Sequence, residues 1–122
     1  MNAEIHETET GIVVDGKEII FNSWKDGDEA DWVKIGTDVV VLATGKPKTK
    51  EEVDVHLSKG CKKVIVASTP ENFKDIQIFV PGANDENIDF KSNVFSLGSN
   101  TANAVAPILK ALNKDVGVER AF

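Results

Sequence analysis

Apolar positions along the chain fall into short runs that are separated by polar turns. Residues 12–21 (IVVDGKEIIF) hold two apolar runs around Asp15-Gly16, a pair that tolerates the positive φ angles of a type I′ turn, so they predict a β-hairpin. Residues 38–43 (DVVVLA) are a continuous β-branched run, which is typical of a strand covered on both faces in a parallel sheet. Residues 63–67 (KVIVA) repeat this pattern and predict a second strand.

Capping residues predict two helices. Thr49 and Glu52 have the spacing of a capping box, so a helix begins there, reaches about Lys59 and ends at Gly60. Because this helix joins the two apolar strands, the three elements predict a β-α-β unit. The second helix begins within residues 96–107 (SLGSNTANAVAP) and extends to about Asn113, with a kink expected at Pro107.

The remaining segments predict irregular or short elements. Residues 22–37 mix Asp, Gly and charge around Trp24 and Trp32, which predicts an irregular connection whose indoles pack against the core. Short strands are expected over residues 76–80 and 93–97, and a strand is expected to begin after Gly117.

Length and composition narrow the function classes. The chain has 122 residues, of which 41% are hydrophobic and 28% charged, as is ordinary for one globular domain. It contains no membrane-length apolar stretch and its N-terminus has no apolar signal region, so a cytoplasmic protein without a membrane partner is expected. The net charge of -6 and the scattered lysines argue against a nucleic-acid partner. One cysteine and two separated histidines predict neither a disulfide nor a metal site.

The junction at residues 96–107 has two interpretations. Short polar side chains there accept hydrogen bonds from first-turn amides, and capping alone explains them. Alternatively, the free amides and the positive end of the helix dipole bind an anion or lower the pKa of a nucleophile. Other candidate side chains are most simply structural or solvated: Cys61, His56 and the acidic group Glu4, Glu7 and Glu9.

Three stretches in order resemble motifs of the phosphorylating glyceraldehyde-3-phosphate dehydrogenases. Residues 96–122 are similar to the family's active-site segment, SNASCTTNCLAP followed by a helix and a glycine-containing loop. Residues 38–68 resemble its DVVVESTG, a threonine-rich helix start and GAKKVIISAP, and residues 78–89 resemble MFVMGVNHEKYD. The resemblance covers roughly residues 11–122. It implies one partial NAD(P)-binding domain over residues 1–122, an α/β fold with half of a doubly wound, mostly parallel Rossmann-like sheet and an N-terminal β-hairpin.

The resemblance assigns positions at the junction. The family's nucleophilic cysteine falls at Asn100, whose carboxamide cannot form the thiohemiacetal or thioester of covalent aldehyde oxidation, so no catalytic residue is expected. Ser99 and Thr101 match the flanking residues, where the family also binds phosphate. Asn103 matches the family's Asn, and Ala104 stands where its second cysteine usually lies.

The resemblance also assigns cofactor positions. Ala43, Thr44 and Gly45 match the Ser-Thr-Gly that borders the dinucleotide. Ser68 or its neighbour Ala67 matches the segment near the nicotinamide. NAD is the family's cofactor, and weak or absent binding is expected here because the chain contains no GxGxxG cradle.

In the strand order 3-2-1-4-5-6, the chain would supply only the second half of the sheet. The strand at residues 38–43 then presents an unpaired edge, which we expect self-association, a complementing chain or residues 2–21 to cover.

Three hypotheses follow. The chain is a truncated, catalytically incompetent member of this glycolytic oxidoreductase family with a binding or assembly role and residual nucleotide or phosphate binding. Alternatively, it is part of an NAD-dependent phosphorylating aldehyde dehydrogenase completed by other segments, or a structural fragment without ligand. The chain alone is expected to be inactive.

Overall fold

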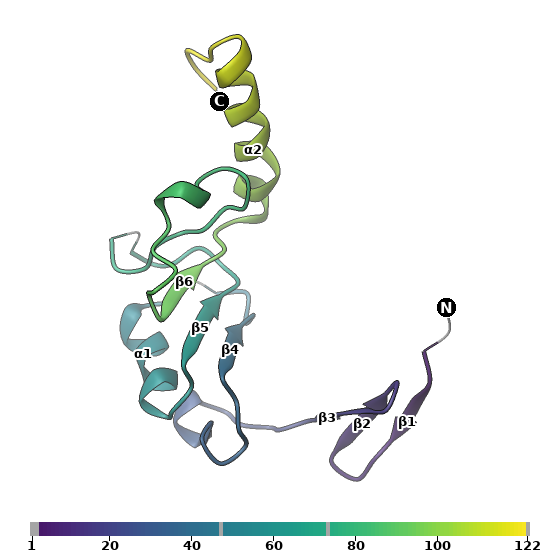
Figure 1. Cartoon of the computed structure of the whole chain (residues 1–122). Coiled ribbons are helices and arrows are strands. Elements are labelled where there is room, and N and C mark those ends of the chain that lie inside the picture. The colour runs from purple at the N-terminus through teal and green to yellow at the C-terminus, as the bar shows by residue number, and fades with distance from the viewer. Residues whose placement is uncertain (1–2, 47, 73, 122) are drawn as a thin grey trace.

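Two small sheets and two helices make up the computed structural model, which describes residues 3–46, 48–72 and 74–121 (Figure 1). Sheet A is antiparallel, with order β1 (Ile5–Glu7), β2 (Gly11–Val14), β3 (Lys17–Ile20). Sheet B is parallel, with order β4 (Val39–Leu42), β5 (Lys63–Val66), β6 (Val94–Ser96). The helices are α1 (Lys50–Ser58) and α2 (Asn100–Asp115), with short 3-10 turns η1 (Gly27–Glu29) and η2 (Asp85–Asn87). The predicted class, a partial Rossmann-like α/β fold with an N-terminal hairpin, is confirmed.

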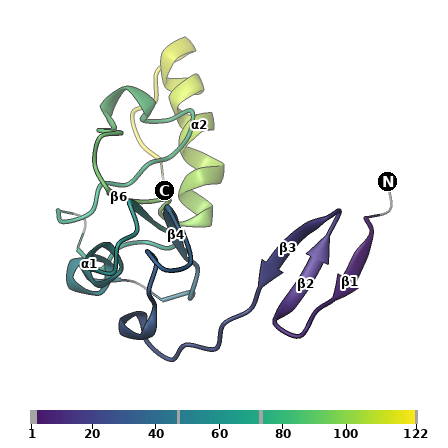
Figure 2. The same ribbon diagram turned by 60° about the horizontal axis from the view of Figure 1, so that its bottom comes forward.

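Sheet A contains the predicted hairpin and one strand that the sequence did not predict. Asp15 and Gly16 have φ angles of 47° and 78°, as a type I′ turn requires. The additional strand β1 pairs with β2, and the backbone N–H of Glu4 donates to the Asp15 carboxylate at 2.9 Å. The acidic N-terminal segment is therefore exposed, as expected, but part of it is a strand rather than a simple solvated end. Figures 1 and 2 show sheet A standing apart from the rest of the molecule.

The β4-α1-β5 unit forms as predicted. The Glu52 backbone N–H donates to Thr49 Oγ1 at 3.2 Å and the Thr49 N–H donates to Glu52 Oε2 at 2.9 Å, which completes the capping box. Gly60 then ends the turn after α1 with a φ of 100°. The core lies between α1 and sheet B and contains these buried residues: Val40, Leu42, Val53, Cys61, Val64, Val66 and Ile76.

Strand β4 differs from its prediction, because only one of its faces is covered. Val40 and Leu42 are buried toward α1, whereas Val39 and Val41 on the other face are 46% and 56% exposed. Within the described residues, no strand pairs with the outer edge of β4. Residues 3–21 pair with one another in sheet A, so they do not provide the expected cover. The β-branched run correctly predicted the strand, but burial of its second face needs an additional layer.

Two other predicted strands are wrong. Residues 76–80 contribute a single bridge between Ile78 and Ser96, because the next position facing β6 is Pro81, which has no N–H to donate, and the Gly98 N–H donates to Ser96 Oγ instead. After Gly117, residues 118–121 form no strand, and the Val118 N–H donates to Asn113 Oδ1 at 3.0 Å. Phe122 lies outside the described residues.

Helix α2 is longer than expected and continues through Pro107 to Asp115. It projects beyond sheet B (Figure 1) and bears exposed apolar side chains at Val105, Ile108 and Leu112. Among the described residues, no helix has both the length and the apolar character needed to cross a bilayer.

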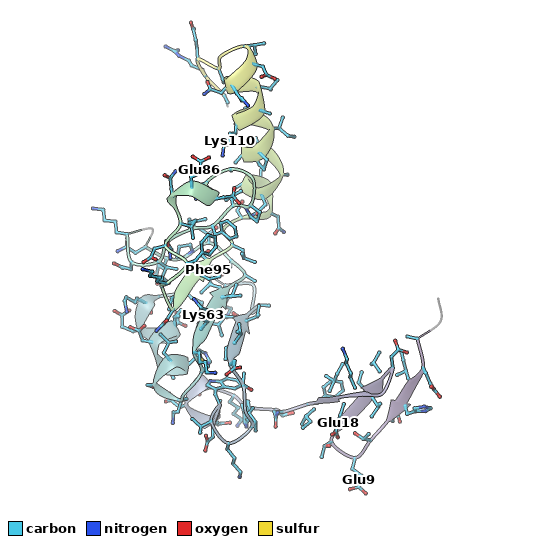
Figure 3. The ribbon with its side chains drawn as sticks, in the orientation of Figure 1. Glu9, Glu18, Lys63, Glu86, Phe95 and Lys110 are labelled. Atoms are coloured by element: carbon cyan, nitrogen blue, oxygen red, sulfur yellow. The ribbon has the colours of Figure 1, made fainter. Side chains whose placement is uncertain are left out.

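Lys63, at the start of β5, fixes the loop that leads into β6. Its ammonium group donates to the backbone oxygens of Phe90 and Ser92 at 2.8 and 2.9 Å. Figure 3 shows Lys63 below Phe95, whose ring packs edge-on against Phe79 with centroids 6.3 Å apart. These contacts set the position of β6 and therefore of the junction that follows it.

Candidate functional site

The carboxyl ends of three parallel strands bring together most of the residues that the resemblance assigns. Thr44 follows β4, Ser68 follows β5 and Ser99 follows β6, and parallel neighbours in the order β4-β5-β6 end at the same edge. In open α/β sheets, this edge is where ligands bind. The fold therefore places the predicted cofactor and phosphate positions along one edge.

A chain of hydrogen bonds ties these three strand ends together. The Ser68 hydroxyl donates to Lys46 O at 2.9 Å, and the Ser96 hydroxyl donates to Ser68 O at 2.5 Å. The Gly98 N–H in turn donates to Ser96 Oγ at 2.8 Å. Ser96 is completely buried, so its hydroxyl links the loop after β5 to the loop after β6 without water.

Ser96 is a residue of this edge that the sequence did not predict. Its signal is a hydroxyl in an otherwise apolar strand, two residues before a glycine. Gly98 is required there for a backbone reason: its φ is 68°, and a Cβ would lie 2.9 Å from Ile78 Cγ2. Only the tertiary structure shows that this pair shapes the approach to α2.

At the start of α2, capping is confirmed. Ser99 is the N-cap, and its hydroxyl oxygen accepts from the Ala102 N–H at 3.2 Å. The Asn103 amide group donates to Leu97 O at 2.6 Å and to Ser99 O at 3.0 Å, which fastens the first turn to the preceding loop. The side chain of Asn103 thus holds the first turn of α2 against the preceding loop.

Asn100, the position matched to the nucleophile, is the first residue of α2 and is exposed. Thr101 beside it is exposed as well, and no acidic residue lies in this first turn. Ala104 follows one turn later on the same helix face. The location can present a side chain to a ligand, but the carboxamide of Asn100 has no ionisable atom with which to form a covalent intermediate.

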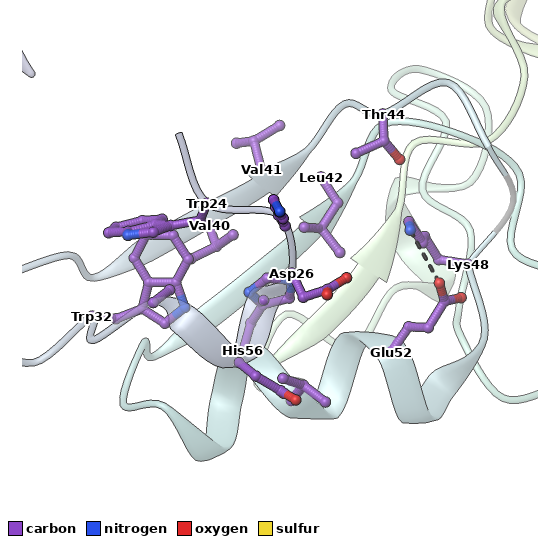
Figure 4. A pocket seen from close by; sticks show the side chains of 15 residues that line it. Trp24, Asp26, Trp32, Val40, Val41, Leu42, Thr44, Lys48, Glu52 and His56 are labelled. Carbon is purple, nitrogen blue, oxygen red and sulfur yellow. Dashed lines mark hydrogen bonds and ion pairs between the residues drawn. The ribbon is translucent and has the colours of Figure 1, made fainter. Parts of the chain in front are cut away.

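The positions after β4 are also open to solvent. Ala43, Thr44 and Gly45 are exposed, and a Cβ at Gly45 would meet no atom within 4 Å. Thr44 lines a cavity of about 470 Å³ between β4, α1 and residues 24–32 (Figure 4). The backbone of residues 43–45 is therefore accessible to a ligand at this edge.

Three aromatic side chains form one wall of that cavity. Trp24 and Trp32 meet edge-on with centroids 5.3 Å apart, and the Trp32 ring lies 5.8 Å from the His56 ring. Trp32 packs against the core as predicted, whereas Trp24 is 37% exposed and rests on Trp32. Burial lowers the pKa of His56, Lys48 lowers it further and Asp28 opposes the shift.

Cys61 is structural in this fold. Its side chain is buried, its thiol donates to His56 O at 3.2 Å, and burial raises its pKa. It lies after α1, at the opposite end of β5 from Ser68. The thiol is therefore neither ionised nor located at the carboxyl edge.

The fold and the candidate site define an α/β protein that has part of a Rossmann-like sheet. A strand-to-helix junction lies at the carboxyl edge of this sheet. The chain is 40% identical over 121 residues to glyceraldehyde-3-phosphate dehydrogenase 1 of Bacillus cereus and 38% identical over 121 residues to the enzyme of that name from Geobacillus stearothermophilus. It is 36% identical over 121 residues to that of Clostridium pasteurianum. No protein-family model matches the chain.

These matches cover 98–99% of this chain and 36% of each relative. The chain thus spans about a third of the length of the curated relatives it matches. The resemblance carried by the motifs is confirmed, and the chain is glyceraldehyde-3-phosphate dehydrogenase-like over nearly all of its residues.

Proposed function

We propose that this chain is a non-catalytic glyceraldehyde-3-phosphate dehydrogenase-like polypeptide, a partial NAD(P)-binding domain that binds an anionic ligand and assembles with another chain. The observation that carries the proposal is Asn100 at the first position of α2. Around it, the capping hydrogen bond of Ser99 and the hydrogen bond from the Asn103 side chain to Leu97 O are both formed. The junction therefore has the architecture of a site without a nucleophile.

Loss of catalysis follows from the chemistry of the side chains. Covalent aldehyde oxidation needs a thiolate that attacks the carbonyl carbon, and an amide nitrogen whose lone pair is delocalised does not replace it. Cys61 cannot substitute, because its thiol is buried, has a raised pKa and donates to a helix carbonyl.

Anion binding is supported by the exposed first turn of α2. Free backbone N–H groups and the helix dipole attract negative charge there, and the first turn holds no carboxylate to compete. Ser99 and Thr101 are both exposed beside these amides. Inorganic phosphate, or the phosphate of a nucleotide, has the chemistry that these groups recognise.

The residues present fit part of a dinucleotide rather than all of it. Residues 43–45 offer accessible backbone, but the Ser68 hydroxyl already donates to Lys46 O. This chain itself supplies no GxGxxG turn for a pyrophosphate. NAD is therefore proposed to bind weakly, with residues 43–45 against the nucleotide; when bound, it would supply a hydride acceptor.

Assembly is supported by the free edge of β4. Its outward N–H and C=O groups have no strand partner among the described residues, and Val39 and Val41 are exposed beside them. An unpaired apolar edge of this kind favours addition of another strand. We propose that a second copy or a complementing chain supplies it.

We also propose a cytoplasmic location; a relative from Gracilaria gracilis, 38% identical over 114 residues, is named as cytosolic.

The test is a titration of the full chain with phosphate and then NAD, followed by amide resonances. Movement at Thr44, Ser99 and Thr101 is expected, and silence at all three would favour a structural fragment without ligand. No NADH is expected from aldehyde, NAD and phosphate. Sustained turnover would instead support the alternative, an NAD-dependent phosphorylating aldehyde dehydrogenase, and overturn the non-catalytic proposal.

Asn100→Cys tests the junction directly, in a Cys61→Ala background. A thiol at the first turn of α2 is expected to have a pKa below the usual ~8.5, because the helix dipole stabilises the thiolate. Its alkylation rate against pH measures this pKa. The control is a thiol placed by Ser58→Cys at the C-terminal end of α1, and its pKa is expected to show no such lowering. An unlowered pKa at position 100 would contradict the anion-attracting junction.

A further inference from the structure

The loop at residues 24–32 lies against α1 through aromatic contacts. Its Trp32 ring lies 5.8 Å from the His56 imidazole, and a Cβ at Gly27 would lie 2.6 Å from His56 Cε1. The imidazole is therefore packed between an indole and the backbone of η1. Figure 4 shows Trp32 and His56 side by side, one from the loop and one from the helix.

Two polar atoms in this contact have no partner. Trp32 Nε1 and His56 Nδ1 are both buried, and neither makes a hydrogen bond within the described part of the chain. Indole Nε1 is only a donor, whereas an imidazole nitrogen accepts only when it carries no proton. A buried donor without an acceptor is unfavourable, so these two groups are complementary when the imidazole is neutral.

We propose that residues 24–32 form a pH-sensitive latch in which the unpartnered Nδ1 of neutral His56 is available as an acceptor for the unpartnered Trp32 Nε1–H. Protonation of His56 removes this acceptor and releases the loop from α1. Protonation converts Nδ1 from an acceptor into a donor, so two buried N–H groups are left in this contact with no acceptor between them. It also places a positive charge on a partly buried side chain, where burial disfavours the charged form.

The charged groups around His56 set the pH at which the latch opens. Burial is the main cause of its lowered pKa, Lys48 contributes in the same direction and Asp28 from η1 opposes it. Lys25, Asp26 and Glu52 also line the cavity. Because the folded pKa lies below the usual 6.5, the latch is closed above about pH 6.5 and opens as the pH falls through the lowered value.

Release of the loop would open the cavity beside β4. The wall that moves carries Trp24 and Trp32, and the opposite wall includes Val40 and Leu42 from the core side of the strand. The latch thus links protonation of one histidine to exposure of apolar surface near the free edge of the sheet. It does not depend on the proposed anion site or on catalysis.

Tryptophan fluorescence reads this latch selectively, because the chain has two tryptophans, both in the cluster, and no tyrosine. The emission maximum of the full chain is expected to shift to longer wavelength as the pH falls from 8 to 5, with a midpoint below 6.5, while far-UV circular dichroism stays unchanged. His56→Gln keeps a neutral acceptor at all pH values and should abolish the shift. His6→Gln is the matched control, since His6 is exposed on sheet A, and should leave it intact.

Nuclear magnetic resonance of the unmodified chain decides the matter if His56→Gln does not fold. His56 is expected to titrate below pH 6.5, and the Trp32 Nε1–H resonance should follow the His56 curve. A pH-independent emission spectrum, an emission shift that survives His56→Gln, or a His56 that titrates at or above pH 6.5 would overturn the latch.

Discussion

The two helices of this protein begin in similar ways but serve different purposes. The first turn of α1 contains Glu51 and Glu52, and its capping box satisfies the helix amides internally. The first turn of α2 has the Ser99 cap and no acidic residue. Helix α1 buries Val53 completely against sheet B, whereas α2 leaves much of its apolar face exposed. Helix α1 is therefore a structural crossover, whereas α2 has a helix start with no carboxylate in its first turn, which is where the proposed anion would bind.

The largest expected effect tests the packing difference. Val53→Ala removes two methyl groups from a completely buried position and should lower the free energy of unfolding by about 2–3 kcal/mol. The matched change on α2 is Val105→Ala, which alters a side chain that is 43% exposed and should cost less than about 0.5 kcal/mol. Urea denaturation of both variants measures the difference, and equal losses would show that α2 is packed as tightly as α1.

Ser96→Ala should have the next largest effect. It leaves Ser68 O and the Gly98 N–H without their buried partner, at a cost of about 2 kcal/mol. Ser58→Ala removes an exposed hydroxyl that donates to a helix carbonyl and should change stability by less than about 0.5 kcal/mol. Thermal unfolding measures both, and amide shifts around Ser99 should change only in the first variant. A neutral Ser96→Ala would show that the network does not position the junction.

The next prediction compares removal of the N-cap of α1 with removal of the N-cap of α2. Thr49→Ala and Ser99→Ala should each reduce stability by about 1 kcal/mol, because each removes the acceptor of one first-turn amide. Phosphate affinity, measured by amide titration, should fall only for Ser99→Ala. Equal affinity in the two variants would contradict an anion site at α2.

The smallest expected effect is the response of the caps to acid. The hydrogen bond from the Thr49 backbone, with help from Lys48, lowers the pKa of Glu52 below 4.5. Its contribution is therefore present above about pH 4.5 and is lost as the pH falls through the lowered value. Relative to the intrinsic rate at each pH, amide exchange in the first turn of α1 should accelerate over that range, whereas exchange at α2 should not. A matching acceleration at α2 would point to general unfolding.

Local patterns predicted the elements that depend on near neighbours. The Asp15-Gly16 turn, the capping box and the cap of α2 each involve residues within a few positions of one another, and all formed as expected. The expected strand at residues 76–80 forms only one bridge, because Pro81 has no N–H for the next ladder position and the Gly98 N–H donates to Ser96 Oγ. The site was predicted by resemblance as separate positions, and the Ser96 bridge between them escaped because its partner is 28 residues away.

The sequence by itself determined the β-α-β unit and the helix starts, since these rest on side-chain type and short spacing. Its resemblance to the dehydrogenase motifs implied that Asn100 stands where the family has a thiol. The tertiary structure alone decided which face of β4 is covered, which strand ends meet at Ser96, and that Trp32 and His56 lie together with unpartnered nitrogens. The physical reason is that burial and hydrogen bonding between distant segments depend on which surfaces meet. Only the folded chain brings those surfaces into contact.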